Sequence, residues 1–248
     1  SLSIIIKEKK NMSNYPKGYS ACGLHCGIKK AKDDLTIVYS DVAASVAAVY
    51  TNNLFQAAPL QVTKAHLSSE GKAQAIVINS GVANAAMGKQ GIVDAEAVAK
   101  KLAQTFNIKD NYTIVASTGV IGMPLPVDTI NSGIEMAKGV LKPLEEGAES
   151  ASRGIMTTDT VPKTAQVTVK IDGKTVNFWG MCKGAGMIHP NMSTMLGFVL
   201  CDAAITTEVL QKALSSAIGD SFNLISVDGD TSTNDMVTVL ANGLAENE

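Results

Sequence analysis

The stretch Ala165-Gln-Val-Thr-Val-Lys-Ile-Asp-Gly-Lys-Thr-Val-Asn-Phe178 carries the clearest structural signal in the chain. Apolar and polar residues alternate on both sides of Asp172-Gly173, as they do in strands that bury one face. Asp-Gly favours a two-residue turn, because both positions accept the positive φ angles that a tight hairpin needs. The stretch therefore predicts a β-hairpin.

Further strands are predicted where short runs are rich in β-branched and apolar residues. These runs are Leu35–Tyr39, Ser45–Thr51, Ala75–Asn79, Tyr112–Ala116, Met195–Cys201 and Phe222–Val227. The pair Ser40-Asp41 is expected to form a turn between the first two runs.

Helices are predicted where apolar residues recur at spacings of three and four. The predicted helices are Ile92–Phe106, Asp128–Lys138, Leu144–Arg153, a helix capped by Thr206 with an apolar face from Val209 to Ile218, and Asn234–Leu240. Strands and helices mix without strict βαβ alternation. This favours a layered α/β or α+β domain in which mixed sheets pack between helices.

The composition excludes several classes of protein. The chain has 248 residues, 46% of them hydrophobic, and a formal charge of −2, so it can form a core and lacks the high net charge of a disordered chain. The acidic balance predicts no surface for nucleic acid. The chain also lacks the run of about 18 apolar residues that a membrane-spanning helix needs. Neither nucleic acid nor a membrane is an expected partner.

Four cysteines in a chain of this length are too few for a disulfide scaffold, which favours a reducing, cytoplasmic location. Cys22-x-x-His25-Cys26 contains residue types that bind zinc, but no second ligand pair follows at the spacing of a zinc site. We therefore expect no bound metal.

Five short polar segments follow apolar runs, and catalytic residues often lie in such loops at the ends of rigid elements. The segments are Asn79–Asn84, Ala116–Gly122, Met156–Thr160, Lys183–Thr194 and Val227–Asp235. They are the candidate positions for chemistry in this chain.

The fourth segment places a threonine hydroxyl where a constrained loop enters a predicted strand. Gly184 and Gly186 allow unusual backbone angles, and Pro190 restricts the backbone before Thr194. If the Thr194 hydroxyl attacked the preceding peptide bond, cleavage after Ser193 would free the Thr194 amine. That amine could then activate the same hydroxyl as an N-terminal nucleophile. From these residues alone, an ordinary threonine at the start of a strand is the competing interpretation.

The segment Lys183-Gly-Ala-Gly-Met-Ile-His-Pro-Asn-Met-Ser-Thr-Met-Leu196 resembles the self-cleavage motif of the ornithine acetyltransferase (glutamate N-acetyltransferase) family. Further stretches resemble motifs of that family in the same order: Pro16–Ala21, Ala116–Gly122, Ile155–Thr160 and Val227–Asp235. Several long motifs in one order are far more specific than a single short pattern. The resemblance extends from about Pro16 to the last residue.

The resemblance implies an autoprocessing acetyltransferase of arginine biosynthesis with an N-terminal-nucleophile-like architecture. Family members cut themselves before the motif threonine, here between Ser193 and Thr194, into an α piece (1–193) and a β piece (from 194) that stay together. Thr194 then takes the acetyl group from N2-acetylornithine and passes it to glutamate. The resemblance also suggests paired α/β units, (αβ)2 or larger. No cofactor is expected, although acetyl-CoA is left open as an alternative donor, which would add amino-acid N-acetyltransferase activity.

The resemblance also assigns individual site residues. Thr118 and Gly119 match the family's oxyanion donors, a hydroxyl and a backbone N–H. Lys183 and Thr157 match substrate-binding residues, and Thr194 both binds substrate and attacks it. Without the resemblance, Thr118-Gly119 would be interpreted as a turn that ends a strand, and Lys183 as a solvated loop lysine. Thr157 would be interpreted as a helix cap or a turn residue.

Two features depart from the family pattern. Ser193 stands where the family typically has alanine, and its hydroxyl competes with that of Thr194. If Thr194 begins the β piece, only 55 of its residues (248 − 193) are present. We therefore expect the β piece to be incomplete here, without the acidic residue and the Asn/Thr pair that family β pieces add to the site.

Two alternatives remain open. The same nucleophile and oxyanion donors would serve an amidase or aminopeptidase that uses water as the acceptor. The chain could also be a truncated, non-catalytic domain that only folds or binds a partner.

Overall fold

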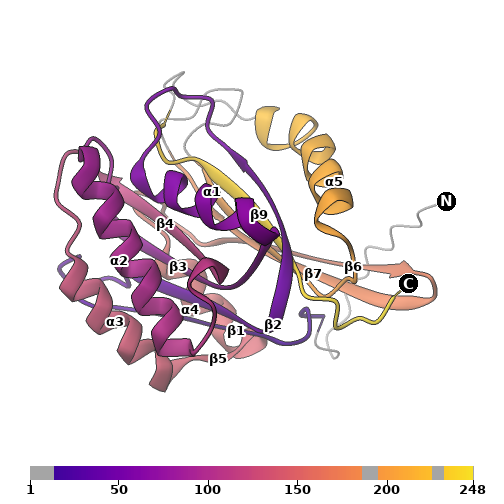
Figure 1. The fold of residues 1–248 in the computed structure, drawn as a ribbon. Helices are drawn as coiled ribbons and strands as arrows, with labels where there is room; N and C mark the ends of the chain where they lie inside the picture. Colours follow the sequence, from indigo (N-terminus) through magenta and orange to yellow (C-terminus); the bar gives the residue numbers. More distant parts are fainter. Residues whose placement is uncertain (1–13, 186–194, 225–231, 248) are drawn as a thin grey trace.

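The computed structural model describes residues 14–185, 195–224 and 232–247 (Figure 1). Within these ranges, the strands are β1 (Tyr19–Leu24), β2 (Leu35–Tyr50), β3 (Lys72–Val82), β4 (Thr113–Val120), β5 (Lys142–Pro143), β6 (Lys163–Ile171), β7 (Lys174–Lys183), β8 (Leu196–Cys201) and β9 (Met236–Ala241). The helices are α1 (Ala58–Glu70), α2 (Gly88–Phe106), α3 (Val127–Val140), α4 (Leu144–Gly154) and α5 (Thr207–Gly219), with short 3-10 turns at Asp110–Tyr112 and Phe222–Leu224.

The strands join in one mixed sheet with the order β4-β3-β2-β9-β8-β7-β6. The pairs β3–β4 and β8–β9 are parallel, and the other neighbours are antiparallel. The first half of β2 also pairs with β1, which in turn pairs with β5. The mixed sheet with helices packed against it confirms the predicted layered α/β class.

The turn predicted at Ser40-Asp41 is wrong, because β2 continues through it as one strand. The pairing of β2 with β3 shifts register between Tyr39 and Ala44, so the strand is irregular there but unbroken. On the other side, Ser40 pairs with Tyr19, and the backbone N–H of Asp41 donates to the carbonyl of Gly18 at 2.9 Å. The backbone bonds on the β1 side keep this polar pair extended, although neither residue pairs with β3.

The helix predicted over Asn234–Leu240 is also wrong, because β9 occupies Met236–Ala241. All six residues of β9 are buried, since the strand lies between β2 and β8 and is covered on both faces. A strand buried on both faces shows no alternation, so its pattern resembles that of a buried helix. In the strand predicted over Phe222–Val227, residues 222–224 form a 3-10 turn instead, and residues 225–227 lie outside the described residues.

The hairpin and the other predicted helices are confirmed. β6 and β7 pair from Lys163–Cys182 to Ile171–Lys174, and the turn residues Asp172 and Gly173 have φ angles of 48° and 76°. The predicted helices coincide with α2, α3, α4 and α5 apart from a few residues at their ends.

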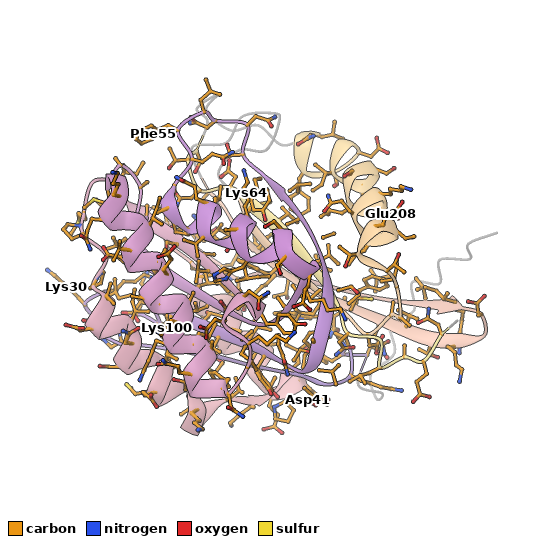
Figure 2. The ribbon with its side chains drawn as sticks, in the orientation of Figure 1. Lys30, Asp41, Phe55, Lys64, Lys100 and Glu208 are labelled. Atoms are coloured by element: carbon orange, nitrogen blue, oxygen red, sulfur yellow. The ribbon has the colours of Figure 1, made fainter. Side chains whose placement is uncertain are left out.

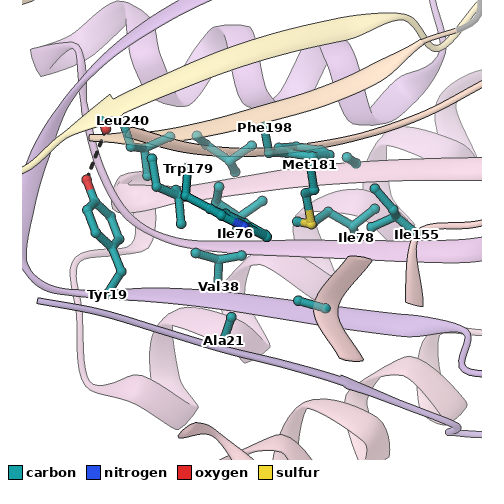
Figure 3. Packing of buried hydrophobic residues seen from close by; sticks show 14 of the residues in the cluster. Tyr19, Ala21, Val38, Ile76, Ile78, Ile155, Trp179, Met181, Phe198 and Leu240 are labelled. Atoms are coloured by element: carbon teal, nitrogen blue, oxygen red, sulfur yellow. Dashed lines mark hydrogen bonds between the residues drawn. The ribbon is translucent and has the colours of Figure 1, made fainter. Parts of the chain in front are cut away.

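The largest core is formed where side chains of β1–β4 pack against side chains of β7–β9 (Figure 3). Val38, Ile76 and Ile78 point toward Trp179 and neighbouring side chains of the other strands. Helix α4 closes this core, whereas α2 and α3 cover the opposite face of β1–β4, and α5 covers β2 and β9. None of the helices in the described ranges is long and apolar enough to cross a membrane.

Candidate active site

A cavity of about 550 Å³ lies at the ends of the parallel strands β3 and β4. All five polar segments singled out in the sequence contribute to its wall. One lining residue from each segment is Gly81, Thr118, Thr157, Lys183 and Ser232. Segments far apart in the chain are therefore neighbours in space.

Four of the predicted site residues line this cavity: Thr118, Gly119, Thr157 and Lys183. The predicted cleavage pair, Ser193 and Thr194, lies outside the described residues. The next residue, Met195, is described and buried, and its backbone N–H donates to Asp235 Oδ1 at 2.9 Å. Asp235 directly follows Asn234, which lines the cavity.

The ends of β3 and β4 come close enough that position 119 has no room for a side chain. Gly119 has φ +136°, and a Cβ atom there would lie 2.2 Å from the carbonyl carbon of Gly81. The strand pairing is irregular at this point, since Val82 pairs with both Thr118 and Val120. Glycine at 119 therefore lets two backbones meet at the cavity wall.

The Thr118 hydroxyl contacts a buried ammonium group. Lys183, at the end of β7, donates from Nζ to Thr118 Oγ1 at 3.1 Å, and its side chain is only 5% exposed. Burial lowers the pKa of Lys183, whereas the negative charges of Asp159 and Asp235 act in the opposite direction. A hydroxyl that accepts a bond from a cation is a stronger donor of its own proton.

Asp159 connects two of the polar segments. Its buried carboxylate accepts bonds from Lys163 Nζ at 2.5 Å, from the Gly184 N–H at 2.9 Å and from the Thr157 N–H at 3.3 Å. Burial alone would raise the pKa of Asp159, but these hydrogen bonds outweigh it and hold the pKa below its usual value. The loop that carries Thr157 is thereby tied to the backbone that follows Lys183.

Asn234 connects three other parts of the wall. Its side-chain amide donates to the carbonyl oxygens of Ala83 at 2.7 Å and Ser117 at 2.9 Å, and its backbone N–H donates to Ser232 Oγ at 3.1 Å. Asn234 is 7% exposed, so these bonds are shielded from water. They fix the ends of β3 and β4 relative to the residues before β9.

Lys29 is a further cation on the cavity wall, and the sequence analysis did not identify it. Its Nζ donates to the carbonyl oxygens of Met156 at 2.6 Å and Asp33 at 2.9 Å. Burial lowers its pKa, the negative charges of Asp34 and Asp33 act in the opposite direction, and the positive charge of Lys183 is one of the smaller causes that lower it. Its loop has no recognisable motif, so only the pairing of β1 with β2 brings it to the cavity.

The described histidines lie away from the cavity wall. His25 contacts Asp34, and His66 contacts Thr113; His189 lies outside the described residues. Within the described ranges, no cluster of three or more His, Cys, Asp or Glu side chains could hold a metal ion.

The sequence is similar to curated proteins named arginine biosynthesis bifunctional protein ArgJ. The relative from Bacillus anthracis is 53% identical over 233 residues, which cover 93% of this chain and 56% of the relative. The relative from Halalkalibacterium halodurans is 50% identical over 244 residues, covering 98% of this chain and 59% of the relative. The chain thus spans little more than half the length of these curated relatives.

Two solved structures are similar to this chain in both fold and sequence. The crystal structure of arginine biosynthesis bifunctional protein ArgJ from Bacillus halodurans matches with a TM-score of 0.68 and 46% identity, covering 74% of this chain and 93% of that chain. Ornithine acetyltransferase from Mycobacterium tuberculosis, solved in complex with ornithine, matches with a TM-score of 0.62 and 35% identity, covering 74% and 95%.

A more distant match concerns the fold alone. An L-aminopeptidase D-Ala-esterase/amidase from Ochrobactrum anthropi, a variant of the Ntn hydrolase fold, has a TM-score of 0.55 and 12% identity, covering 92% of this chain and 72% of that chain. Together with the M. tuberculosis structure, it confirms the expected N-terminal-nucleophile-like architecture. The family model for ArgJ matches residues 20–248, so the segments that form the cavity wall all lie within the match, and the chain belongs to the ArgJ family.

Proposed function

We propose that this chain is the part of an ornithine acetyltransferase that carries the nucleophile and the oxyanion site. The enzyme would move an acetyl group from N2-acetylornithine to glutamate in arginine biosynthesis. The observation that carries this proposal is the cavity in which Thr118, Gly119, Thr157 and Lys183 come together. Membership of the ArgJ family and the ornithine bound to the M. tuberculosis relative support the substrate class.

The first step would be self-cleavage between Ser193 and Thr194. The Thr194 hydroxyl attacks the carbonyl carbon of Ser193, and the peptide C–N bond breaks as an ester forms. Water then hydrolyses the ester and leaves a carboxylate on Ser193 and a free amine on Thr194. The products are an α piece, 1–193, and a β piece that begins at Thr194 and stays bound to it through the β7–β8 and β2–β9 pairs.

Two observations support a cut at this position. The backbone is held on both sides of it, at Gly184 by Asp159 and at Met195 by Asp235. The B. halodurans match covers 74% of this chain and 93% of the solved chain, so the solved chain is roughly four fifths as long as this one (74/93). The M. tuberculosis match gives nearly the same length ratio (74/95). The proposed α piece, 193 of 248 residues, has that same share of this chain.

The second step would use the new N-terminal threonine as a carrier. The Thr194 amine accepts the hydroxyl proton as Thr194 Oγ attacks the acetyl carbonyl, and ornithine leaves with that proton on its amine. Glutamate's amine then attacks the acetyl ester and frees the hydroxyl. Each tetrahedral oxyanion would accept bonds from the Thr118 hydroxyl and the Gly119 N–H. The bond from Lys183 to Thr118 supports this role, because it makes the hydroxyl a better donor.

The charge of the wall also suits an amino-acid substrate. Among the described residues that line the cavity, Lys29 and Lys183 are charged and none is acidic. A substrate carboxylate would neutralise the buried ammonium of Lys183, and the hydroxyl of Thr157 would lie beside it. The cavity therefore favours an anionic amino acid.

Cleavage is tested by expressing the full-length protein as wild type and as Thr194→Ala. We expect two pieces from the wild type on a denaturing gel and one piece from Thr194→Ala, because alanine has no hydroxyl to attack. Ser193→Ala is the matched control and should still be cut, which would also remove Ser193 as the alternative nucleophile. Identical cutting of wild type and Thr194→Ala would contradict the proposal.

The acceptor is tested on the same purified wild-type protein. With N2-acetylornithine alone, intact mass should show one acetyl group on the piece that begins with Thr194. Added glutamate should remove that group as N-acetylglutamate. Release of free acetate at the same rate with and without glutamate would favour an amidase, and the absence of any adduct on a folded, cut protein would favour a non-catalytic domain.

A further inference from the structure

Lys29 is built into the cavity wall by several fixed contacts. The carboxylate of Asp34, which is fully buried, accepts backbone N–H bonds from Cys26 at 2.7 Å, Gly27 at 3.2 Å and Lys29 at 2.8 Å. These bonds shape the loop between β1 and β2 around one side chain. The backbone of Lys29 is therefore held in place independently of its own side chain.

The ammonium group of Lys29 is held as well. Its Nζ donates to the carbonyls of Met156 and Asp33, and an ammonium group has three donors. Two of the three are thus satisfied by protein carbonyls, which carry no net charge. Like Lys183, Lys29 lines the cavity, so two lysines border a space whose described wall contains no carboxylate.

The two lysines differ in what surrounds them. Lys183 contacts the proposed oxyanion hydroxyl of Thr118, whereas Lys29 contacts the backbone beside Thr157. The proposed acceptor, glutamate, carries two carboxylates, and the proposed donor, N2-acetylornithine, carries one. A wall with two separate cations matches the dicarboxylate better than it matches the donor.

We propose that Lys29 binds the side-chain carboxylate of the acetyl acceptor and makes the site prefer glutamate over neutral amino acids of the same shape. This inference rests on the proposed acetyl transfer. It assigns Lys183 to the carboxylate nearer the reacting amine and Lys29 to the distal one. A neutral side-chain amide would leave the third donor of Lys29 with a weaker partner.

The test compares glutamate with glutamine as acceptors, because glutamine has the same shape and lacks the side-chain charge. In the wild-type full-length protein, kcat/KM should be about 10- to 100-fold higher for glutamate, which is the range of a hydrogen bond to a charged group. In Lys29→Met, this preference should fall to within about threefold. The loss should appear in KM for glutamate, with KM for N2-acetylornithine changed little.

Two variants separate this role from a merely structural one. Lys29→Arg keeps the positive charge and should restore part of the preference for glutamate. Lys30→Met removes the neighbouring lysine, which is exposed at the surface, and should leave the preference as in the wild type (Figure 2). If Lys29 only holds the Met156 loop, Lys29→Met will slow both acceptors equally and the preference will persist, which would overturn the inference. A wild type that acetylates neither acceptor would overturn the proposed function instead.

Discussion

Gly119 sits at the narrowest point of the cavity wall. Its φ of +136° is unfavourable for other residues, and any Cβ would also meet the Gly81 backbone. A side chain there would force β3 and β4 apart. The adjacent Thr118 hydroxyl, which Lys183 holds, would then move with the backbone.

We expect Gly119→Ala to destabilise the protein and to reduce the proposed acetyl transfer. Gly122→Ala is the matched control, because Gly122 also has a positive φ, +77°, but open space around its Cβ position. The control should show only the cost of the backbone angle, about 1–2 kcal/mol. Gly119→Ala should cost about 1–3 kcal/mol more, the usual range for overpacking. Equal urea-unfolding free energies for the two variants would refute the steric argument.

At the scale of a single element, α5 shows a start signal that is readable in the sequence. The Thr206 hydroxyl accepts the N–H of Val209 at 3.4 Å, as predicted for an N-cap. The predicted apolar face is narrower than expected, since Leu210, Leu214 and Ile218 are buried and Val209 is 52% exposed. The helix packs on β2 and β9 through these three residues.

Thr206→Ala should lower the free energy of unfolding by about 1 kcal/mol, because one N–H of the first turn loses its partner. The proposed acetyl transfer should remain at the wild-type level, since α5 does not contribute to the described cavity wall. Ser216→Ala, at an exposed position inside the same helix, should change stability slightly in the opposite direction. Thermal unfolding and the transfer assay measure both effects, and a large loss of activity in Thr206→Ala would contradict this view of α5.

At the scale of the whole molecule, a few buried polar side chains hold the cavity together. Asp159 joins the Thr157 loop to the end of β7, and Asn234 joins β3 and β4 to the residues before β9. These connections bridge segments that are distant in sequence. Stability and the shape of the site are therefore coupled through them.

Asp159 should make stability depend on pH. Its folded pKa is lowered, so its stabilising effect is present above the pKa of the unfolded state and is lost as pH falls through the folded value. Asp159→Asn should be less stable than the wild type by about 1–3 kcal/mol at neutral pH. That difference should shrink as the pH falls below 4. Asp172→Asn, which removes an exposed carboxylate from the hairpin turn and leaves Asn-Gly, should show no such trend.

Local signals in the chain were enough for much of the fold. The Asp172-Gly173 hairpin and helices α2 to α5 follow from alternation, periodicity and capping, which act within a few residues. Helix α1 was missed, although Pro59 lies in its first turn and Gly71 ends it with φ 61°. Strand β1 was missed because its small residues, Ala21, Cys22 and Gly23, carry little strand propensity.

Some site residues could be identified from the sequence, and others only from the structure. Thr118, Gly119, Thr157 and Lys183 were named from motifs that resemble the family, and the structure places them on one wall. Lys29, Asp159 and Asn234 also have partners nearby in the chain, but the bonds that join them to other parts of the wall need distant segments, so no local pattern could assign them. These distant partners lie 127 positions away for Lys29 (Met156), 25 for Asp159 (Gly184) and 151 for Asn234 (Ala83).

The amino-acid sequence by itself determined the local elements and the family, because turn chemistry, helix periodicity and ordered motifs are properties of neighbouring residues. Only the tertiary structure decided that β2 continues as one strand through Ser40-Asp41, that Met236–Ala241 is a strand, and that two lysines line one cavity. Those outcomes depend on hydrogen bonds and burial supplied by segments far away in the chain. A local sequence pattern does not show such partners, because they come close only when the strands pair into a sheet.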